Sequence, residues 1–143
     1  MATTELSGVR TAIAARIVAL SADWKESKFV PDRLGLDPAS VAHQAFSVDL
    51  PAGHTTGGRQ RQSLTQSETV IVRFTWQVKP KDQVTSYDDG LNAERALMNQ
   101  LIAPSWTSTF QLLYVNSSRL TLETGEWRRH VLTFNALLYL TTE

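Results

Sequence analysis

Residues suited to metal or acid–base chemistry are scattered along this chain. His43, His54 and His130 are its three histidines, and no two of them have the short spacing of a metal site. We therefore expect polar surface or hydrogen-bonded histidines. The sequence contains no cysteine, which excludes disulfides, thiol nucleophiles and cysteine-ligated zinc. Asp88 and Asp89 are adjacent, but neighbouring residues of a helix point in different directions, so their carboxylates cannot share a proton.

Motifs for phosphate binding and nucleophilic catalysis are also missing. The segment Gly57-Gly58-Arg59 lacks the spacing and the lysine of a P-loop, and no helix is expected directly after it. No serine lies in a Gly-x-Ser-x-Gly motif. We predict that the chain is not an enzyme and holds neither cofactor nor metal. One alternative stays open, a small-molecule-binding or enzymatic domain that uses Trp76, Tyr139 or His130 on an uncovered sheet face as a pocket wall.

The arginines supply the remaining candidate contacts, in two clusters. Arg59 and Arg61 lie in a glycine-rich polar segment, while Arg128 and Arg129 follow Trp127. Solvated surface charge is the simplest interpretation of both clusters. The alternative is that Arg59 and Arg61 contact acidic groups of a partner protein, because a guanidinium binds a carboxylate in a directional, bidentate manner. Arg128 and Arg129 cannot form one patch, since adjacent residues of a strand face opposite sides of its sheet.

The charge balance argues against a generic nucleic-acid-binding protein. Lys plus Arg number 14 and Asp plus Glu number 14, so the formal net charge is zero. The first residues, Met1 to Glu5, show neither the basic start nor the apolar stretch of a signal peptide. No segment approaches the roughly 18 consecutive apolar residues of a membrane span, so no membrane contact is expected.

The first half of the chain predicts a helix and two strands. Apolar residues spaced by three and four predict a helix over Leu6–Trp24. From Val41 the apolar period becomes two, which predicts a strand that ends at Pro51. Residues 52–65 are polar and glycine-rich and are expected to form a flexible loop. A β-branched and aromatic run over residues 69–78 predicts a second strand, antiparallel to the first.

The second half predicts a helix and three further strands. A helix is expected from Thr85 or Ser86 to Ile102, with Tyr87, Leu91, Met98 and Leu101 on its buried face and Asp88 and Asp89 in its first turn. Short strands follow over 110–115 and 119–124, separated by a turn at Asn116-Ser117-Ser118, and a long strand runs from Trp127 to Thr141. The order α-β-β-α-β-β-β predicts one α+β domain over residues 1–143. Its mixed, antiparallel-dominated sheet of about four to five strands would pack against two main helices.

The last strand is apolar on both faces, which is unusual for a sheet covered by helices on one side. Leu132, Phe134 and Ala136 alternate with a second set of residues that is too apolar for full exposure. Either loops cover this second face, or it contacts another subunit. The predicted subunit interface consists of Ile71, Arg73, Trp127, Arg129, Val131, Leu137 and Tyr139.

Several segments in this order resemble a known family. They are the amphipathic helix Leu6–Trp24, the strand His43-Gln-Ala-Phe46, the run from Ser67 to Phe74, the helix opening Tyr87 to Glu94, and the closing strand Trp127 to Tyr139. The order of these segments, their lengths and their residue types resemble those of the tail terminator, or tail-completion, proteins of long-tailed bacteriophages. The resemblance covers most of the chain but includes no catalytic signature. Another phage neck or tail-tube protein is the alternative within the same class.

The resemblance implies a structural virion protein that acts as a ring, expected to be a hexamer. Such a ring caps the tail tube, ends its polymerisation and joins the tail to the head–tail connector. The implied partners are other copies of the chain, the tail tube protein and the connector or stopper protein. The genome would pass through the lumen without specific binding, which a zero net charge allows. The ring would assemble in the host cytoplasm and reside in the tail or neck of the virion, with Arg59 and Arg61 contacting the tube.

Overall fold

A computed structural model describes residues 6–34, 36, 41–55, 63–102, 110–122 and 126–141. The elements are α1 (Leu6–Leu20), β1 (Lys25–Glu26), η1 (Pro31–Arg33), β2 (Ala45–Thr55), β3 (Ser63–Gln77), α2 (Gln83–Ile102), β4 (Phe110–Thr121) and β5 (Trp127–Thr141). The strands form a single five-stranded sheet in the order β1-β2-β3-β5-β4. β1 is parallel to β2, and all other neighbours are antiparallel. This confirms the predicted α+β class and the mixed, antiparallel-dominated sheet.

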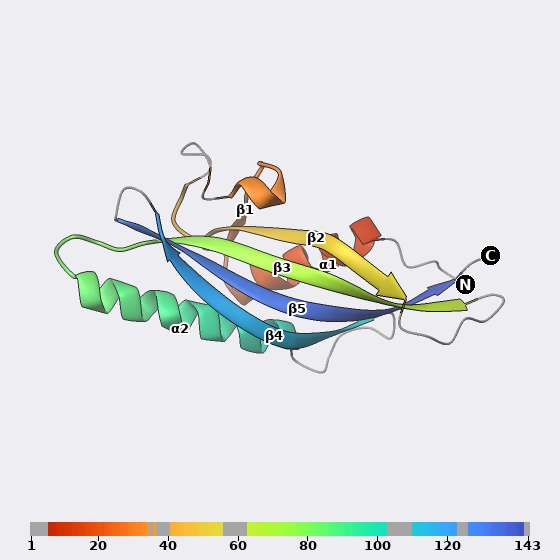
Figure 1. The fold of residues 1–143 in the computed structure, drawn as a ribbon. Coiled ribbons are helices and arrows are strands. Elements are labelled where there is room, and N and C mark those ends of the chain that lie inside the picture. Colours follow the sequence, from red (N-terminus) through yellow and green to blue (C-terminus); the bar gives the residue numbers. More distant parts are fainter. Residues whose placement is uncertain are drawn as a thin grey trace.

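Both helices pack on one face of the sheet, while η1 lies on the other side. In Figure 1, α2 runs along the lower side of the strands and η1 stands above them. The side chains that fill the core on the helix side come from alternate positions of the strands, as the pleat of a sheet requires. They include Phe46 and Val48 of β2, Val70, Val72 and Phe74 of β3, and Leu132, Phe134 and Ala136 of β5.

The first helix is shorter than predicted, but its apolar residues pack as expected. Val9, Ile13 and Ile17 are buried, whereas the chain leaves the helix after Leu20 instead of continuing to Trp24. The backbone N–H of Trp24 donates to the carbonyl of Ser21 across 3.2 Å in the turn that follows. That turn carries the indole of Trp24 onto the edge of the Phe74 ring, with a centroid distance of 5.0 Å. Trp24 therefore joins the core without being helical.

The predicted end of the first strand at Pro51 is wrong, because β2 continues to Thr55. The pairing of β2 with β3 shifts between Asp49 and Ala52, which is the irregularity of a β-bulge. Proline is tolerated at position 51 because β1 pairs only with Ala45 and Phe46. No described strand lies beside Pro51 on that side of β2, so no ladder hydrogen bond is lost there through the missing N–H of proline. Within the predicted loop 52–65, residues 52–55 belong to β2 and residues 63–65 to β3. Residues 56–62, with Arg59 and Arg61, lie outside the described residues.

The two short strands predicted over 110–124 are a single strand, β4. Its register against β5 shifts between Tyr114 and Asn116, so Val115 forms a bulge, and residues 116–118, predicted as a turn, pair with β5. The hydroxyl groups of Tyr114 and Ser117 are hydrogen-bonded at 2.9 Å beside this bulge. The turn-forming residues Asn116, Ser117 and Ser118 are thus accommodated within an edge strand.

The buried face of the second helix is rotated from the predicted one and shares Leu101 with it. Its buried residues are Ser86, Gly90, Glu94, Leu97 and Leu101, whereas Tyr87 is exposed and Leu91 and Met98 are only partly buried. The helix also begins at Gln83, so Asp88 and Asp89 are not in its first turn. The prediction counted apolar side chains alone. The helix instead packs through a glycine and through two polar residues that have partners inside the protein.

Candidate functional site

The face of the sheet that is turned away from the helices, here called the outer face, is the main candidate interaction surface. On β5, the buried His130, Leu132, Phe134 and Ala136 alternate with the more accessible Arg129, Val131, Thr133, Asn135 and Leu137. This alternation confirms the predicted division of the last strand into two faces. By the sheet register, the predicted interface residues Ile71, Arg73, Trp127, Arg129, Val131, Leu137 and Tyr139 occupy outer-face positions. The side chain of Tyr139 lies outside the described part of the chain.

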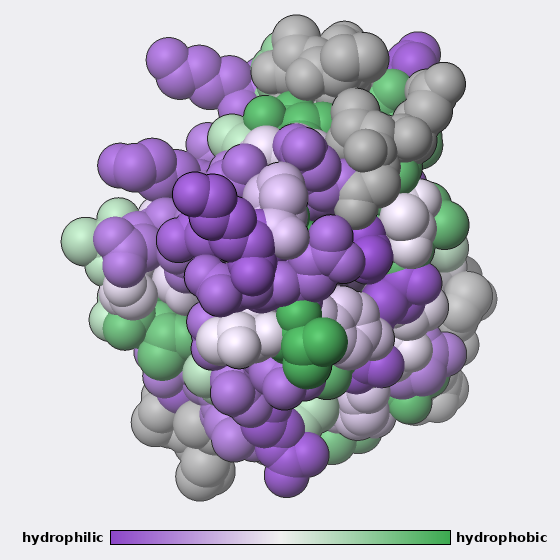
Figure 2. Space-filling model, turned by 90° about the vertical axis from the view of Figure 1, so that its left-hand side faces the viewer, coloured by the Kyte–Doolittle hydropathy of each residue, from purple (hydrophilic) through white to green (hydrophobic). Residues whose placement is uncertain are grey.

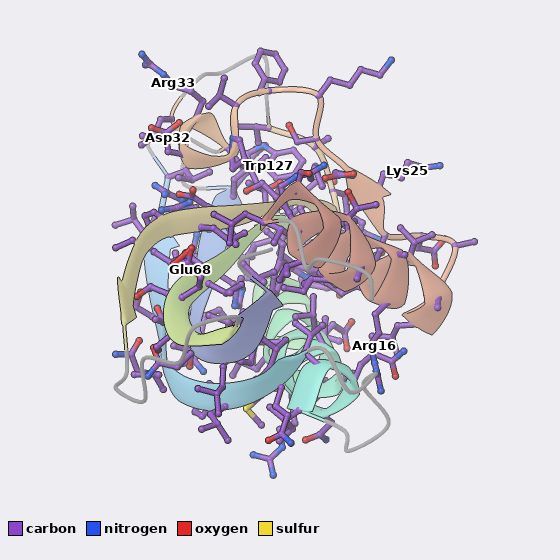
Figure 3. The ribbon with its side chains drawn as sticks, turned by 90° about the vertical axis from the view of Figure 1, so that its right-hand side faces the viewer. Arg16, Lys25, Asp32, Arg33, Glu68 and Trp127 are labelled. Carbon is purple, nitrogen blue, oxygen red and sulfur yellow. The ribbon has the colours of Figure 1, made fainter. Side chains whose placement is uncertain are left out.

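One end of the outer face is covered by residues 27–34, which we call the strap. The carbonyl of Pro31 accepts hydrogen bonds from the Ser47 hydroxyl at 2.9 Å and from Nη1 of Arg73 at 3.5 Å. Leu34 at the end of the strap is completely buried. Figure 3 shows Asp32 and Arg33 of the strap on the same side of the sheet as Trp127, away from α2. The alternative that a loop covers this face therefore holds for this end.

Arg73, which lies beneath the strap, is engaged within the subunit. Nη1 of Arg73 lies 2.9 Å from the Asp49 carboxylate, and the side chain of Arg73 is 12% exposed. The pKa of Arg129 is lowered by burial and by the positive charge of Arg73, which the negative charge of Asp32 partly offsets. The contacts of Arg73 with Asp49 and with the Pro31 carbonyl leave little of this side chain for a partner.

An apolar patch runs along the outer face beside β4, from next to the strap toward the far end of the sheet, and is formed by Ile71, Leu113, Leu120, Val131 and Leu137. Leu113 and Leu120 of β4 are 61% and 51% exposed. They lie opposite Asn135 and Arg129 on β5, and so continue the half-buried surface of Val131 and Leu137. β4 is an edge of the sheet, and no described strand pairs with its outer side. A long apolar edge with one charged residue, Arg119, is a typical site of protein–protein contact.

Leu113 and Leu120 are functional candidates that sequence reasoning missed. The prediction placed them in two separate short strands, where neither could be assigned to a face. The signal that could have found them is the low charge of residues 110–121, which contain a single arginine and no acid. A charge-poor, twelve-residue strand is long enough for an edge that another chain covers.

A buried polar cluster lies on the helix side of the sheet. Glu94 of α2 accepts two hydrogen bonds from Arg119 of β4, from Nε at 3.1 Å and from Nη2. The second member of the cluster is His130 of β5, whose Nδ1 lies 2.9 Å from the Glu94 carboxylate. The imidazole is 1% exposed and is stacked on Phe74 at a centroid distance of 4.5 Å. Burial alone would raise the pKa of Glu94. The hydrogen bonds and charge of His130 and Arg119 lower this pKa by more than burial raises it, so it is below its ordinary value.

This cluster is built for stability. Among the described residues no serine, threonine or lysine nucleophile is hydrogen-bonded to His130, and the imidazole is sealed from solvent. Of the two roles predicted for the histidines, polar surface or hydrogen-bonded, His130 has the second. For two of its three residues, the alternative pocket wall does not lie on the uncovered face. Trp76 and His130 occupy the helix-covered face, where Nε1 of Trp76 donates to the carbonyl of Ser86 at 3.0 Å.

The other histidines do not assemble a site either. Nδ1 of His43 accepts a hydrogen bond from the backbone N–H of Gln77 at 3.2 Å. The pKa of His43 is lowered by partial burial and by the positive charge of Lys79. The side chain of His54 lies outside the described residues. Within the part of the chain that the structure describes, no three histidine or acidic residues are grouped as metal ligands would be.

A hollow opens at the end of the molecule where α2 begins. Its walls come from the end of β3, the first turns of α2 and the start of β5, and its lining residues are Val78, Pro80, Gln83, Val84, Tyr87, Glu126 and Arg128. Figure 2, which looks at this end, shows small hydrophobic areas surrounded by hydrophilic surface. Among the described helices, none has the length and apolar content that crossing a membrane would require.

Comparison with known proteins supports the fold. No protein-family model matches the sequence, and no curated protein matches it. Among solved structures, the chain is similar to a chain of the "Virion of native gene transfer agent (GTA) particle", with a TM-score of 0.55. The alignment covers 92% of this chain and 94% of that chain at 13% sequence identity. At this identity the likeness shows a shared fold.

Proposed function

We propose that the protein is a structural component of a phage-like virion, and specifically a tail terminator. Its copies form a ring, expected to be a hexamer, that caps the tail tube and joins it to the head–tail connector. The proposal is supported by the likeness to a chain of a virion particle over nearly the full length of both chains.

The observation that carries this proposal is the apolar patch that runs along β4 on the outer face. Leucines exposed on an edge strand carry a free-energy cost of roughly 25 cal/mol for each Å² of apolar surface in water. Covering these leucines with another chain removes that cost. A surface with little charge suits contact with protein better than contact with nucleic acid. We expect the patch to lie between subunits of the ring.

The proposed contacts with other proteins are assigned to a different part of the chain. Arg59 and Arg61 lie between β2 and β3, and we propose that they contact acidic groups of the tail tube protein. In this arrangement the genome passes through the lumen without specific binding, and the ring resides in the tail or neck of the virion after assembly in the host cytoplasm.

The test is the assembly state of the purified protein, alone and with its tail tube protein. We expect light scattering and negative-stain imaging to show single closed rings, and tubes grown with the protein present to be shorter and to carry a ring at one end. A chain that polymerises into long tubes would be a tube protein instead. A chain that stays monomeric and leaves tube length unchanged would contradict the proposal.

A further inference from the structure

Arg129 of β5 is a half-buried arginine beside the apolar patch on the outer face. By the sheet register it lies opposite Thr75 of β3 and Leu120 of β4, and Leu120 is 51% exposed. We propose that Arg129 binds a carboxylate of a second copy of the chain, the copy that covers the apolar patch. This inference rests on the proposed self-association and adds to it the chemistry of one contact.

The guanidinium of Arg129 has hydrogen-bonding capacity that the subunit does not use. Its Nε is buried and has no hydrogen-bond partner among the described residues. No ion pair in the described part of the chain includes Arg129 either. A guanidinium has five N–H donors and no acceptor, so it binds groups that offer acceptor oxygens. Since buried donors of folded proteins nearly always have partners, this side chain is open to an acceptor from another molecule.

The charges around Arg129 favour an anion beside it. Arg73 is opposite Val131, so the two arginines are diagonal neighbours across β3 and β5, at the roughly 7–8 Å typical of such positions. Burial and the positive charge of Arg73 lower the pKa of Arg129, and the negative charge of Asp32 offsets them only in part. The carboxylate of Asp49 is already engaged by Arg73. The positive charge of Arg129 is thus incompletely compensated within the subunit, and a further carboxylate would stabilise it.

The surroundings of Arg129 fit a carboxylate carried by a protein better than the phosphates of nucleic acid. The two arginines and the two acids that interact with them sum to zero charge, whereas binding to a phosphate backbone depends on an excess of positive charge. Trp127 and Val131, two residues to either side of Arg129 on the same face, are both half-buried. An arginine bordered by aromatic and apolar side chains is typical of the centre of a protein–protein contact.

The position of Arg129 next to the apolar patch makes a second copy the source of the carboxylate. A chain that covers Leu120 and Val131 comes next to Arg129 as well and removes water from its guanidinium. A carboxylate bound there would fix the orientation of the two copies, because a charge pair inside an apolar contact tolerates few alternative arrangements. The described chain offers exposed acids that form no ion pair within the subunit, namely Asp82, Asp88, Asp89 and Glu126.

Carbodiimide coupling tests this contact directly. The variant Arg129→Lys keeps the positive charge and supplies a primary amine. The carbodiimide joins this amine to an adjacent carboxylate as an amide, and the carboxylate oxygen that is lost leaves on the urea formed from the reagent. Isotope-labelled and unlabelled R129K are mixed and coupled under assembly conditions, and mass spectrometry identifies the linked peptides. We expect position 129 to be joined to an acidic residue in pairs that combine a labelled with an unlabelled chain.

The matched control is Arg95→Lys on the exposed side of α2. Coupling between copies should be at least tenfold more frequent at position 129 than at position 95, because the contact raises the effective concentration of the carboxylate. If wild-type rings form but position 129 couples only within its own chain or not at all, the inference is overturned and the proposed function stands. Coupling to the tail tube protein alone would overturn the assignment to a second copy. If copies couple but no ring closes, the contact is real and the terminator function is wrong.

A second variant covers the case in which lysine is too short to reach the carboxylate. Arg129→Met removes the charge and keeps an apolar side chain, so self-association should weaken at least tenfold while the melting temperature of the dilute protein is unchanged or raised. Arg95→Met should alter neither property. Unchanged self-association of R129M would overturn the inference. A loss of binding to short duplex DNA, with self-association intact, would identify a phosphate as the ligand and overturn it as well.

Discussion

At the scale of single residues, Glu94 is the most consequential side chain of the described structure. It joins α2 to both β4 and β5 through Arg119 and His130. The carboxylate is 8% exposed, whereas Arg119 is 39% exposed, so solvent screens part of its interaction with the arginine. The cluster therefore stabilises the fold mainly through directional hydrogen bonds from charged donors.

Replacing this carboxylate should cost stability. We expect Glu94→Gln to lower the free energy of unfolding by about 2 kcal/mol, because the amide leaves hydrogen-bonding groups of Arg119 or His130 unsatisfied. The measurement is chemical denaturation followed by circular dichroism. Asp88→Asn on the exposed side of the same helix is the matched control and should stay within about 0.5 kcal/mol of the wild type. Equal losses in the two variants would show that the cluster has no special role.

The same carboxylate makes stability depend on pH in a predictable direction. The pKa of Glu94 is lowered in the folded protein from an ordinary value of 4.5, since His130 and Arg119 outweigh the opposing effect of burial. A lowered folded-state pKa gives stability that is present above pH 4.5 and is lost as the pH falls through the folded value. We expect the difference in unfolding free energy between wild type and Glu94→Gln to be constant near pH 7 and to shrink below pH 4.5. A difference that stays constant down to pH 3 would contradict this assignment.

At the scale of elements, the close approach of α2 to the sheet depends on a glycine. A Cβ atom at Gly90 would lie 2.9 Å from Cδ1 of Trp76, and Trp76 is held by its hydrogen bond to Ser86. We expect Gly90→Ala to destabilise the fold by about 1–3 kcal/mol, because overpacking outweighs the gain in helix propensity. Gly8 in α1 has nothing within 4 Å of a built Cβ. Gly8→Ala should therefore stabilise the protein by about 0.5–1 kcal/mol. Thermal unfolding of both variants checks the prediction, and a stabilised Gly90→Ala would refute it.

The elements also show what the sequence can and cannot reveal. Periodicity located α1, β3 and β5 well, because their apolar residues repeat at the period of a helix or of a strand facing a core. It located α2 but not its packing face, which contains Ser86, Gly90 and Glu94. These residues contact Trp76 of β3, Arg119 of β4 and His130 of β5, and apolar periodicity within the helix does not reveal such contacts. It failed again at Pro51 and at Asn116, because a bulge lets an edge strand pass through residues that are typical of turns. The exposed leucines of β4 were missed for the same reason.

At the scale of the whole molecule, a zero net charge becomes informative once the surface is known. Without net charge, copies of the chain do not repel one another strongly, and an apolar patch can drive their association. Arg73 on the outer face is instead engaged within the subunit through its pair with Asp49. Association through Leu113 and Leu120 should then depend on apolar burial more than on ion pairs.

Salt separates these two driving forces. At about 1 M salt, charges are screened beyond roughly 3 Å, whereas apolar burial is not weakened. We expect wild-type assemblies, measured by light scattering, to persist from low salt to 1 M. The double variant Leu113→Lys/Leu120→Lys should stay dissociated at every salt concentration, because two buried and unpaired lysines cost several kcal/mol in each interface. Asn99→Lys on the exposed side of α2 is the control and should assemble normally. If wild-type assemblies dissolve in high salt while the double variant still forms them, charge pairs and not the apolar patch hold the copies together.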